Sequence, residues 1–219
     1  MMILAVDTST LRAAVSLWRD GRALAERHRV VTTHSDALLA MVDEAFVEAN
    51  AAPADVDAIA CGAGPGSFTG LRIGLASAKG LCFALGKPLV MISSLAAIAA
   101  RAPDGRVLAT IDALKGEVYA GLFVVTGGVP VLDGAEAVLP PAKLLPIVDQ
   151  VDAVVGSGAH RYRELAARLL DEEPGPRPSD VARLASLRVA RGDYDDLASA
   201  APAYIRPSEA ELFKQQRSQ

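Results

Sequence analysis

Aromatic residues are scarce in this sequence, at 5% of its 219 residues, so aromatic rings cannot dominate its core. Hydrophobic residues make up 51% and charged residues 22% of the chain. This balance is typical of a globular protein that buries a sizeable core. That core must be built mainly from Ala, Val, Leu and Ile, and the length fits one large domain or two small lobes.

The sequence also lacks an excess of basic residues, since its formal net charge is −4 and its pI is about 5.4. Stand-alone binding of nucleic acid needs a basic face that displaces counterions from phosphates. The composition therefore argues against such binding. A local basic patch, or a basic partner that makes the nucleic-acid contact, stays compatible with it.

Metal-binding and disulfide patterns are missing too. The two cysteines, Cys61 and Cys82, lie in apolar stretches, which favours reduced thiols in the core. The three histidines, His28, His34 and His160, have no partner at helical spacing, and no Cys/His cluster has zinc spacing. We therefore predict no metal site.

Neither a secretory signal nor a membrane span is expected. The apolar start of the chain has no basic region before it, and no apolar run approaches the length that crosses a bilayer. We expect a cytoplasmic protein without membrane contact.

Hydrophobic periodicity and turn residues predict an alternation of strands and helices, with an Asp20-Gly21 hairpin near the start. A helix start with capping-box spacing is expected at Thr33 and Asp36. Strands are expected at 2–6, 13–18, 23–30, 57–61, 89–92, 107–111, 117–125 and 153–155, and helices at 36–50, 71–85, 94–100, 140–148, 161–170 and 179–191.

One pattern occurs twice. A strand ending in Asp7, a turn, a second strand and a glycine turn recur 105 residues later as a strand ending in Asp112 and the same succession. The repeat indicates a duplicated lobe. Each Asp could hold a hydrated cation near phosphates, or it could close an Asx turn.

The glycine-rich loop Gly62–Gly70 leads into the helix expected at 71–85. Backbone N–H groups at a helix start suit an anion, whereas a tight turn packed under a helix needs the same glycines. The helix itself carries the small residues Gly74, Ser77 and Ala78. Together with the broad apolar face of the 36–50 helix, it could dock a partner or pack on its own sheet.

Several motifs occur in an order that resembles one family, the TsaB (YeaZ) family of bacterial tRNA threonylcarbamoyladenosine subunits. The most specific is Gly-Pro-Gly-Ser-Phe-Thr-Gly-Leu-Arg-Ile-Gly at 64–74. The others are Ile-Leu-Ala-Val-Asp-Thr-Ser at 3–9, His-Ser at 34–35, Ser-Ser-Leu at 93–95, Asp112 with Gly-Glu-Val-Tyr at 116–119, and Pro-Ala-Tyr-Ile-Arg at 202–206.

The resemblance covers the whole chain and implies an α/β fold of two RNase-H-like lobes, as in actin-like ATPases (ASKHA), with mixed sheets flanked by helices. Residues 1–104 would form the first lobe, which carries the partner-binding helices. Residues 105–219 would form a reduced second lobe whose C-terminal tail could pack back on the first.

It also implies a non-catalytic subunit. The related catalytic subunit, TsaD, binds a metal through a His-x-x-x-His pair, and the matching positions here hold Ser94 and Ile98. Isoleucine has no donor atom, so neither a metal-dependent transferase nor an M22-type peptidase is expected. A small-substrate kinase of the same fold is the alternative enzyme.

The implied function is that of a scaffold in the complex that adds a threonylcarbamoyl group to N6 of the adenosine beside the anticodon, in tRNAs that read codons starting with A. The implied partners are TsaD and the ATPase TsaE, with tRNA reached only through the complex, and a homodimer when the chain is alone. The expected partner interface comprises Leu38, Leu39, Val42, Phe46, Arg72, Gly74, Leu75, Ala78 and Leu81. No intrinsic cofactor is expected, but ATP or ADP could bind at the complex interface through Asp7, Thr8, Ser9, Gly64 and Gly66.

Overall fold

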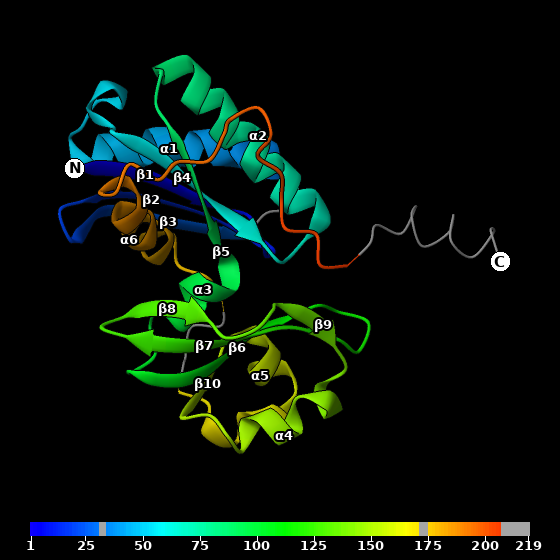
Figure 1. Cartoon of the computed structure of the whole chain (residues 1–219). Coiled ribbons are helices and arrows are strands. Elements are labelled where there is room, and N and C mark those ends of the chain that lie inside the picture. The colour runs from blue at the N-terminus through cyan, green and yellow to red at the C-terminus, as the bar shows by residue number, and fades with distance from the viewer. Residues whose placement is uncertain (31–33, 171–174, 207–219) are drawn as a thin grey trace.

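The computed structural model describes residues 1–30, 34–170 and 175–206, which form two stacked α/β lobes (Figure 1). The helix start predicted at Thr33 and Asp36 lies outside the residues whose side chains are described. Each lobe is a mixed β-sheet flanked by helices, as expected from the alternation of apolar patterns.

The first lobe contains a five-stranded sheet in the order β3-β2-β1-β4-β5. Its strands are β1 (Met2–Asp7), β2 (Arg12–Arg19), β3 (Arg22–Val30), β4 (Ala58–Gly64) and β5 (Leu89–Ser93). Its helices are α1 (His34–Ala49), the 3₁₀ turn η1 (Pro53–Asp55), α2 (Phe68–Leu85) and α3 (Ser94–Ala99). Strands β1, β2 and β3 are antiparallel neighbours, whereas β4 and β5 run parallel to β1.

The second lobe repeats this arrangement with fewer elements. Its strands are β6 (Gly105–Asp112), β7 (Val118–Thr126), β8 (Val129–Leu132), β9 (Ala137–Leu139) and β10 (Ala153–Val155). Its helical segments are η2 (Pro141–Lys143), α4 (Leu145–Val148), α5 (Ser157–Arg161) and η3 (Arg163–Arg168). The sheet order is β10-β6-β7-β8, with β9 also paired to β7. Because β7 is antiparallel and β10 parallel to β6, β6 occupies the place that β1 has in the first lobe, and the predicted duplication is confirmed.

Both faces of the first sheet are covered, which explains why every residue of β1 is buried. Leu4 packs with α1 and α2 in one core cluster, and Ile3 packs in another with the C-terminal helix α6 (Pro178–Val189). A strand covered on both faces reads as a continuous apolar run, as Met2–Asp7 does. The chain therefore returns to the first lobe after completing the second.

Local signals set the turns that shape this sheet. Asp20 and Gly21 have φ values of 47° and 93°, which fits the Asp-Gly hairpin predicted between β2 and β3. Helix α2 begins with Ser67, whose side chain accepts a hydrogen bond from the Gly70 N–H. It ends at Gly86, which adopts the left-handed conformation.

The predictions for the second lobe were partly wrong. The helix expected at 161–170 is instead the 3₁₀ segment η3, and Tyr162, whose backbone is extended, separates it from α5. The helix expected at 140–148 is split into η2 and α4, and the strands β8 and β9 were not predicted. Short segments such as these carry too few residues for a clear period.

Helix α2 meets the length and composition of a membrane-crossing helix, contrary to the expectation that no segment would. Core helices of soluble proteins meet the same criterion. Six residues of α2 are buried in the protein, and the helix packs against β4 and α1. Its apolar character is thus explained in part by its own core.

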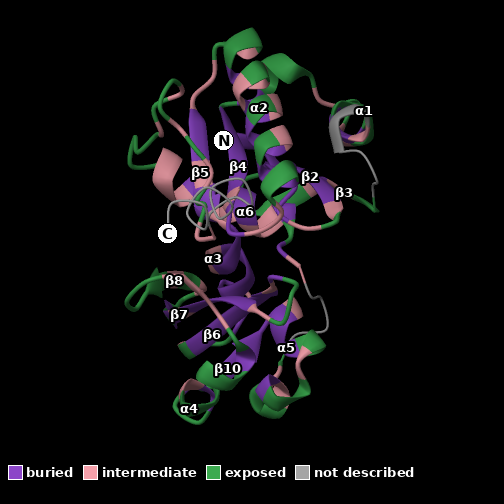
Figure 2. Ribbon diagram, turned by 90° about the vertical axis from the view of Figure 1, so that its right-hand side faces the viewer, coloured by how far each residue is buried: buried purple, intermediate pink, exposed green. Residues whose placement is uncertain are grey.

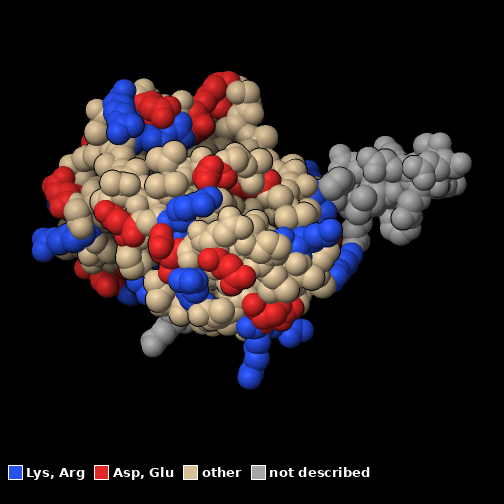
Figure 3. Space-filling model, turned by 60° about the horizontal axis from the view of Figure 1, so that its bottom comes forward, with Lys and Arg blue, Asp and Glu red and all other residues tan. Residues whose placement is uncertain are grey.

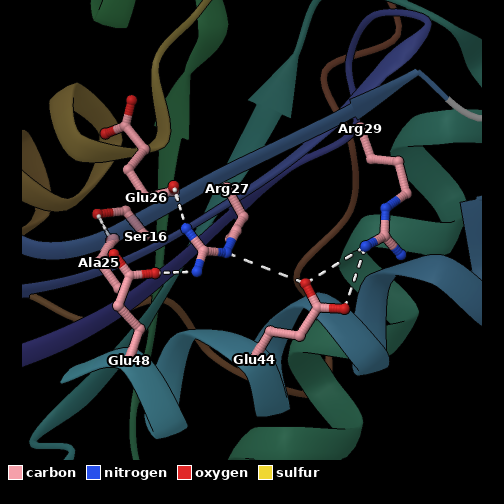
Figure 4. Close-up of polar contacts among 7 residues, drawn as sticks. All are labelled: Ser16, Ala25, Glu26, Arg27, Arg29, Glu44 and Glu48. Carbon is pink, nitrogen blue, oxygen red and sulfur yellow. Dashed lines mark hydrogen bonds and ion pairs between the residues drawn. The ribbon is translucent and has the colours of Figure 1, made fainter. Parts of the chain in front are cut away.

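Charged side chains join the edge strand β3 to α1 (Figure 4). Arg27 forms an ion pair with Glu48 and approaches Glu44 at 4.0 Å, and Arg29 donates to Glu44 at 3.1 Å. Charges on an edge strand discourage unwanted strand pairing. On the face of the molecule that Figure 3 shows, basic and acidic side chains are interspersed rather than gathered into a basic stripe.

Candidate functional site

The turn after β1 is a sealed polar cluster. The Asp7 carboxylate accepts hydrogen bonds from the Ser9 N–H at 2.9 Å, the Ser9 hydroxyl at 2.7 Å and the Ser94 hydroxyl at 3.2 Å. Asp7, Thr8 and Ser9 are each only 1% exposed. Burial raises the pKa of Asp7, and the bonds from Ser9 and Ser94 oppose that rise. The bond from the Ser9 N–H to Asp7 is that of an Asx turn, which is one of the two alternatives that the sequence left open for Asp7.

The glycine-rich loop packs directly against this turn. The Ser67 N–H donates to the Ser9 carbonyl at 2.7 Å, and the Thr8 hydroxyl donates to the Gly70 carbonyl at 2.7 Å. A Cβ added at Gly66 would lie 2.1 Å from the Ser9 carbonyl oxygen, and one at Gly70 would lie 2.0 Å from the Thr8 carbonyl oxygen. The glycines thus let the start of α2 approach β1 closely, which is the tight-turn alternative of the sequence.

The second lobe carries a counterpart of this turn. The Asp112 carboxylate accepts a hydrogen bond from the Leu114 N–H at 2.9 Å, two residues ahead, as Asp7 does from Ser9. The Asp112 N–H donates to the Ser157 hydroxyl at 3.0 Å. A Cβ at Gly156 would lie 2.1 Å from the Thr110 carbonyl oxygen. Both lobes therefore pair an Asx turn with a glycine loop after a parallel strand.

A cavity of about 890 Å³ lies where these two turns face each other. It is within the size range of ligand pockets, which often form between domains. It is lined by Ser9, Thr10, Leu11, Arg12, Gly66, Ser67, Phe68, Thr69, Leu71, Ile111, Asp112, Ala113, Leu114, Lys115, Glu117, Tyr119, Ser157, Gly175, Ala203, Tyr204, Ile205 and Arg206. Of the residues predicted to contact a nucleotide, Ser9 and Gly66 line the cavity, whereas Asp7, Thr8 and Gly64 do not.

The two positions at which the resemblance implies lost metal ligands are packed inside the protein. Ser94 and Ile98 are both 0% exposed. The Ser94 hydroxyl is bonded to Asp7, and Ile98 belongs to the apolar core of the second lobe beside Leu95 and Val107. Among residues 1–30, 34–170 and 175–206, no group of three His, Cys, Asp or Glu side chains is placed to hold a metal ion.

Most of the predicted interface residues face the protein's own core, which corrects their assignment. Leu38, Val42, Phe46, Leu75 and Ala78 are at most 6% exposed and pack together beneath α1 and α2. Gly74 is buried too, since a Cβ there would lie 2.2 Å from the Thr8 hydroxyl, and Leu81 is half-buried against the same core. Periodicity identified an apolar face, and the sheet of the same lobe covers it.

The outward faces of α1 and α2 carry a different set of residues. Of the predicted residues, Leu39 and Arg72 are exposed. Sequence reasoning missed Val47 and Phe83, which are 82% and 86% exposed. Figure 2 shows buried and exposed residues side by side along α2. A deviation from the main apolar period could have identified Val47 and Phe83, because neither falls on the stripe that faces the sheet.

Two RNase-H-like lobes with an Asx turn and a glycine loop at each side of a central cavity define an actin-like two-lobe protein. Residues 28–165 match the family model described as TsaD: tRNA N6-adenosine threonylcarbamoyltransferase. The chain is 34% identical to the tRNA threonylcarbamoyladenosine biosynthesis protein TsaB of Escherichia coli strain K12, with 94% of this chain and 95% of that protein covered.

Two further relatives agree. The Bacillus subtilis protein of the same name is 31% identical, with 96% of each chain covered. The solved structure of YeaZ from Pseudomonas aeruginosa superposes with a TM-score of 0.79 at 38% identity, and 93% of this chain and 99% of that one are covered. The chain belongs to the TsaB family, as its motifs indicated.

Proposed function

We propose that this chain is a non-catalytic subunit in the biosynthesis of threonylcarbamoyladenosine in tRNA, working beside a TsaD-type catalytic subunit. Similarity to TsaB proteins over nearly the full length supports the pathway. The observation that carries the non-catalytic role is the packing of Ser94 and Ile98. One hydroxyl already serves Asp7 and the other side chain is hydrocarbon, so neither is free to hold a metal.

The partner surface in this proposal is the outward face of α1 and α2, not their buried stripe. Leu39, Val47 and Phe83 offer large apolar side chains to solvent, and Arg72 lies on the same outward side of α2 as Ala76. Apolar side chains exposed on neighbouring helices are typical of a protein interface. A TsaD-type subunit would cover this face in the complex, and a second copy of this chain would cover it otherwise.

The remaining partners follow from the same role. TsaE would join the assembled complex in the cytoplasm. tRNA would also be bound through the complex, because this chain is acidic overall. ATP or ADP bound at the complex interface would contact this chain at its cavity, which Ser9 and Gly66 line. Calorimetric titration of ATP and ADP into the chain and into its complex with TsaD tests this part directly.

The function is tested by complementation. Cells depleted of their own TsaB should regain threonylcarbamoyladenosine, measured by mass spectrometry of digested tRNA, when this chain is expressed. The isolated chain should show no threonylcarbamoyl transfer, ATP turnover or peptidase activity. Restoration together with intrinsic transfer activity would overturn the non-catalytic role and leave the pathway intact.

The surface is tested by a matched pair of substitutions. Ala76 in α2 and Ala167 in η3 are both exposed. Ala76→Glu should abolish co-purification with TsaD and complementation while the thermal unfolding curve stays unchanged, because it puts a longer, charged side chain between two apolar surfaces. Ala167→Glu should behave like the parent. Retained binding by Ala76→Glu would show that the interface lies elsewhere.

A further inference from the structure

The segment after α6 runs along the first lobe before it reaches the cavity. The Asp195 N–H donates to the Leu89 carbonyl at 2.9 Å, and the Asp195 carboxylate accepts from the Met91 N–H at 2.7 Å, at the open edge of β5. Farther along, the Lys79 ammonium donates to the Ala198 carbonyl at 3.4 Å. Figure 1 shows this part of the chain crossing from α6 past α2. The segment is thus anchored to the first lobe.

Residues 203–206 then form part of the cavity wall. The Ala203 N–H donates to the Ala63 carbonyl at 2.8 Å, at the end of β4. The Tyr204 ring lies 4.9 Å from the Phe68 ring at the start of α2, centroid to centroid. Aromatic pairs at this separation are attractive. Up to Tyr204, these contacts all belong to the first lobe.

Two residues of this segment contact the second lobe. Ile205 packs against its apolar core, and the polar contacts come from Arg206. Its guanidinium donates to the Ala113 carbonyl at 3.0 Å, forms an ion pair with Glu117 and lies 5.7 Å from the centroid of the Tyr119 ring. All three partners belong to the β6–β7 hairpin or its turn. A planar guanidinium can make these contacts at once, which a lysine cannot. Within four residues the chain therefore binds both lobes.

Two further connections between the lobes lie away from the cavity. Helix α3 packs into the core of the second lobe, and Arg183 of α6 donates to the carbonyls of Ala100 and Gly128 at 3.3 Å and 2.8 Å. None of these residues lines the cavity. Residues 203–206 do line it. The lobes are therefore joined at α3 and α6 away from the cavity, and by Ile205 and Arg206 at the cavity.

We propose that residues 203–206 are a latch that closes the cavity by holding the second-lobe hairpin, with Arg206 as the releasable contact and α3 as the hinge. Release of Arg206 removes the polar contacts between this segment and the hairpin and weakens the hold that Ile205 shares. The hydrogen bond from the Ala203 N–H to the Ala63 carbonyl keeps the segment on the first lobe. A hinge with a separable contact opposite it is the arrangement that permits two-lobe opening. The latch does not depend on the proposed partner surface.

The latch is tested by distance measurement in the full chain. Nitroxide labels at Asp43→Cys in α1 and Asp149→Cys after α4 report on the lobes, since both positions are exposed and the two native thiols are buried. Arg206→Ala should lengthen and broaden the distance distribution measured by electron–electron double resonance. Arg168→Ala removes an exposed arginine of the second lobe and should leave the distribution unchanged.

Hydrogen exchange gives a second readout. Loss of hydrogen bonds from a charged donor should raise the exchange rate of residues 113–119 by about tenfold or more in Arg206→Ala. Distances and exchange rates equal to those of Arg168→Ala would overturn the proposal. If Arg206→Ala loses its native circular dichroism, Glu117→Lys takes its place, because it replaces the ion pair with Arg206 by a repulsion between like charges and leaves the segment itself unchanged. An unchanged distance distribution in that variant would likewise refute the latch.

Discussion

Gly70→Ala tests whether α2 approaches β1 as closely as the structure shows. The added Cβ would lie 2.0 Å from the Thr8 carbonyl oxygen and 3.2 Å from the Ser67 Cβ. A backbone oxygen cannot rotate away, so the start of α2 must move outward. That movement also strains the bond from the Thr8 hydroxyl to the Gly70 carbonyl.

The magnitude follows from opposing contributions. Overpacking a tight core contact costs about 1–3 kcal/mol, and loss of one buried hydrogen bond costs about 1 kcal/mol. The better helix propensity of Ala offsets about 1 kcal/mol. We expect Gly70→Ala to lower the free energy of unfolding by about 1–3 kcal/mol.

Gly80 in the same helix is the matched control, because a Cβ there would meet nothing within 4 Å. Gly80→Ala should raise the free energy of unfolding by about 0.5–1 kcal/mol. Urea unfolding followed by far-UV circular dichroism measures both. If both substitutions stabilise the protein equally, the close approach of α2 to the Asp7 turn is refuted.

Three further predictions rest on burial. Ala78→Glu should lower the free energy of unfolding by more than about 3 kcal/mol, since it places an unpaired charge in the core; a soluble variant with unchanged urea midpoint would contradict this. Burial raises the pKa of Asp180 to about 6, although the nearby charge of Arg101 lowers it. The free energy of unfolding of the wild type should therefore fall by up to about 3 kcal/mol relative to that of Asp180→Asn as the pH rises from about 4 to about 6. Parallel curves of unfolding free energy against pH for the wild type and Asp180→Asn would contradict a raised pKa of Asp180. Burial also raises the pKa of Cys61 and raises that of Cys82 to about 11, so neither thiol should react with a disulfide reagent until urea unfolds the chain.

The parts of the fold that sequence predicts well depend on local chemistry. The Asp20-Gly21 hairpin and the two strand–Asp–turn units each arise from a few adjacent residues, and each is present. The two cysteines are buried and free, as their apolar surroundings indicated. A residue's own neighbours determine these features.

The parts that sequence could not predict depend on what covers a surface. Leu38 and Leu39 are adjacent and chemically identical, yet one is 0% and the other 51% exposed. The apolar stripe that Leu38 shares with Val42 predicts that this face of α1 is buried. It does not indicate whether the protein's own sheet or a partner protein buries it. The same limit applies to α6, whose pattern does not reveal that it packs on the first sheet.

The two Asx turns show how the duplicated lobes have come to differ. Asp7 is 1% exposed and is sealed by Ser9 and Ser94 beneath α2, whereas Asp112 is half-buried and lines the cavity. Burial destabilises the charged form of the Asp7 carboxylate. Its contacts instead fix the turn against which α2 packs, and Gly66 and Gly70 permit that close packing. In the first lobe, the Asx turn at Asp7 therefore supports the start of α2. Its counterpart in the second lobe remains open to whatever enters the cavity, beside the hairpin that Arg206 holds.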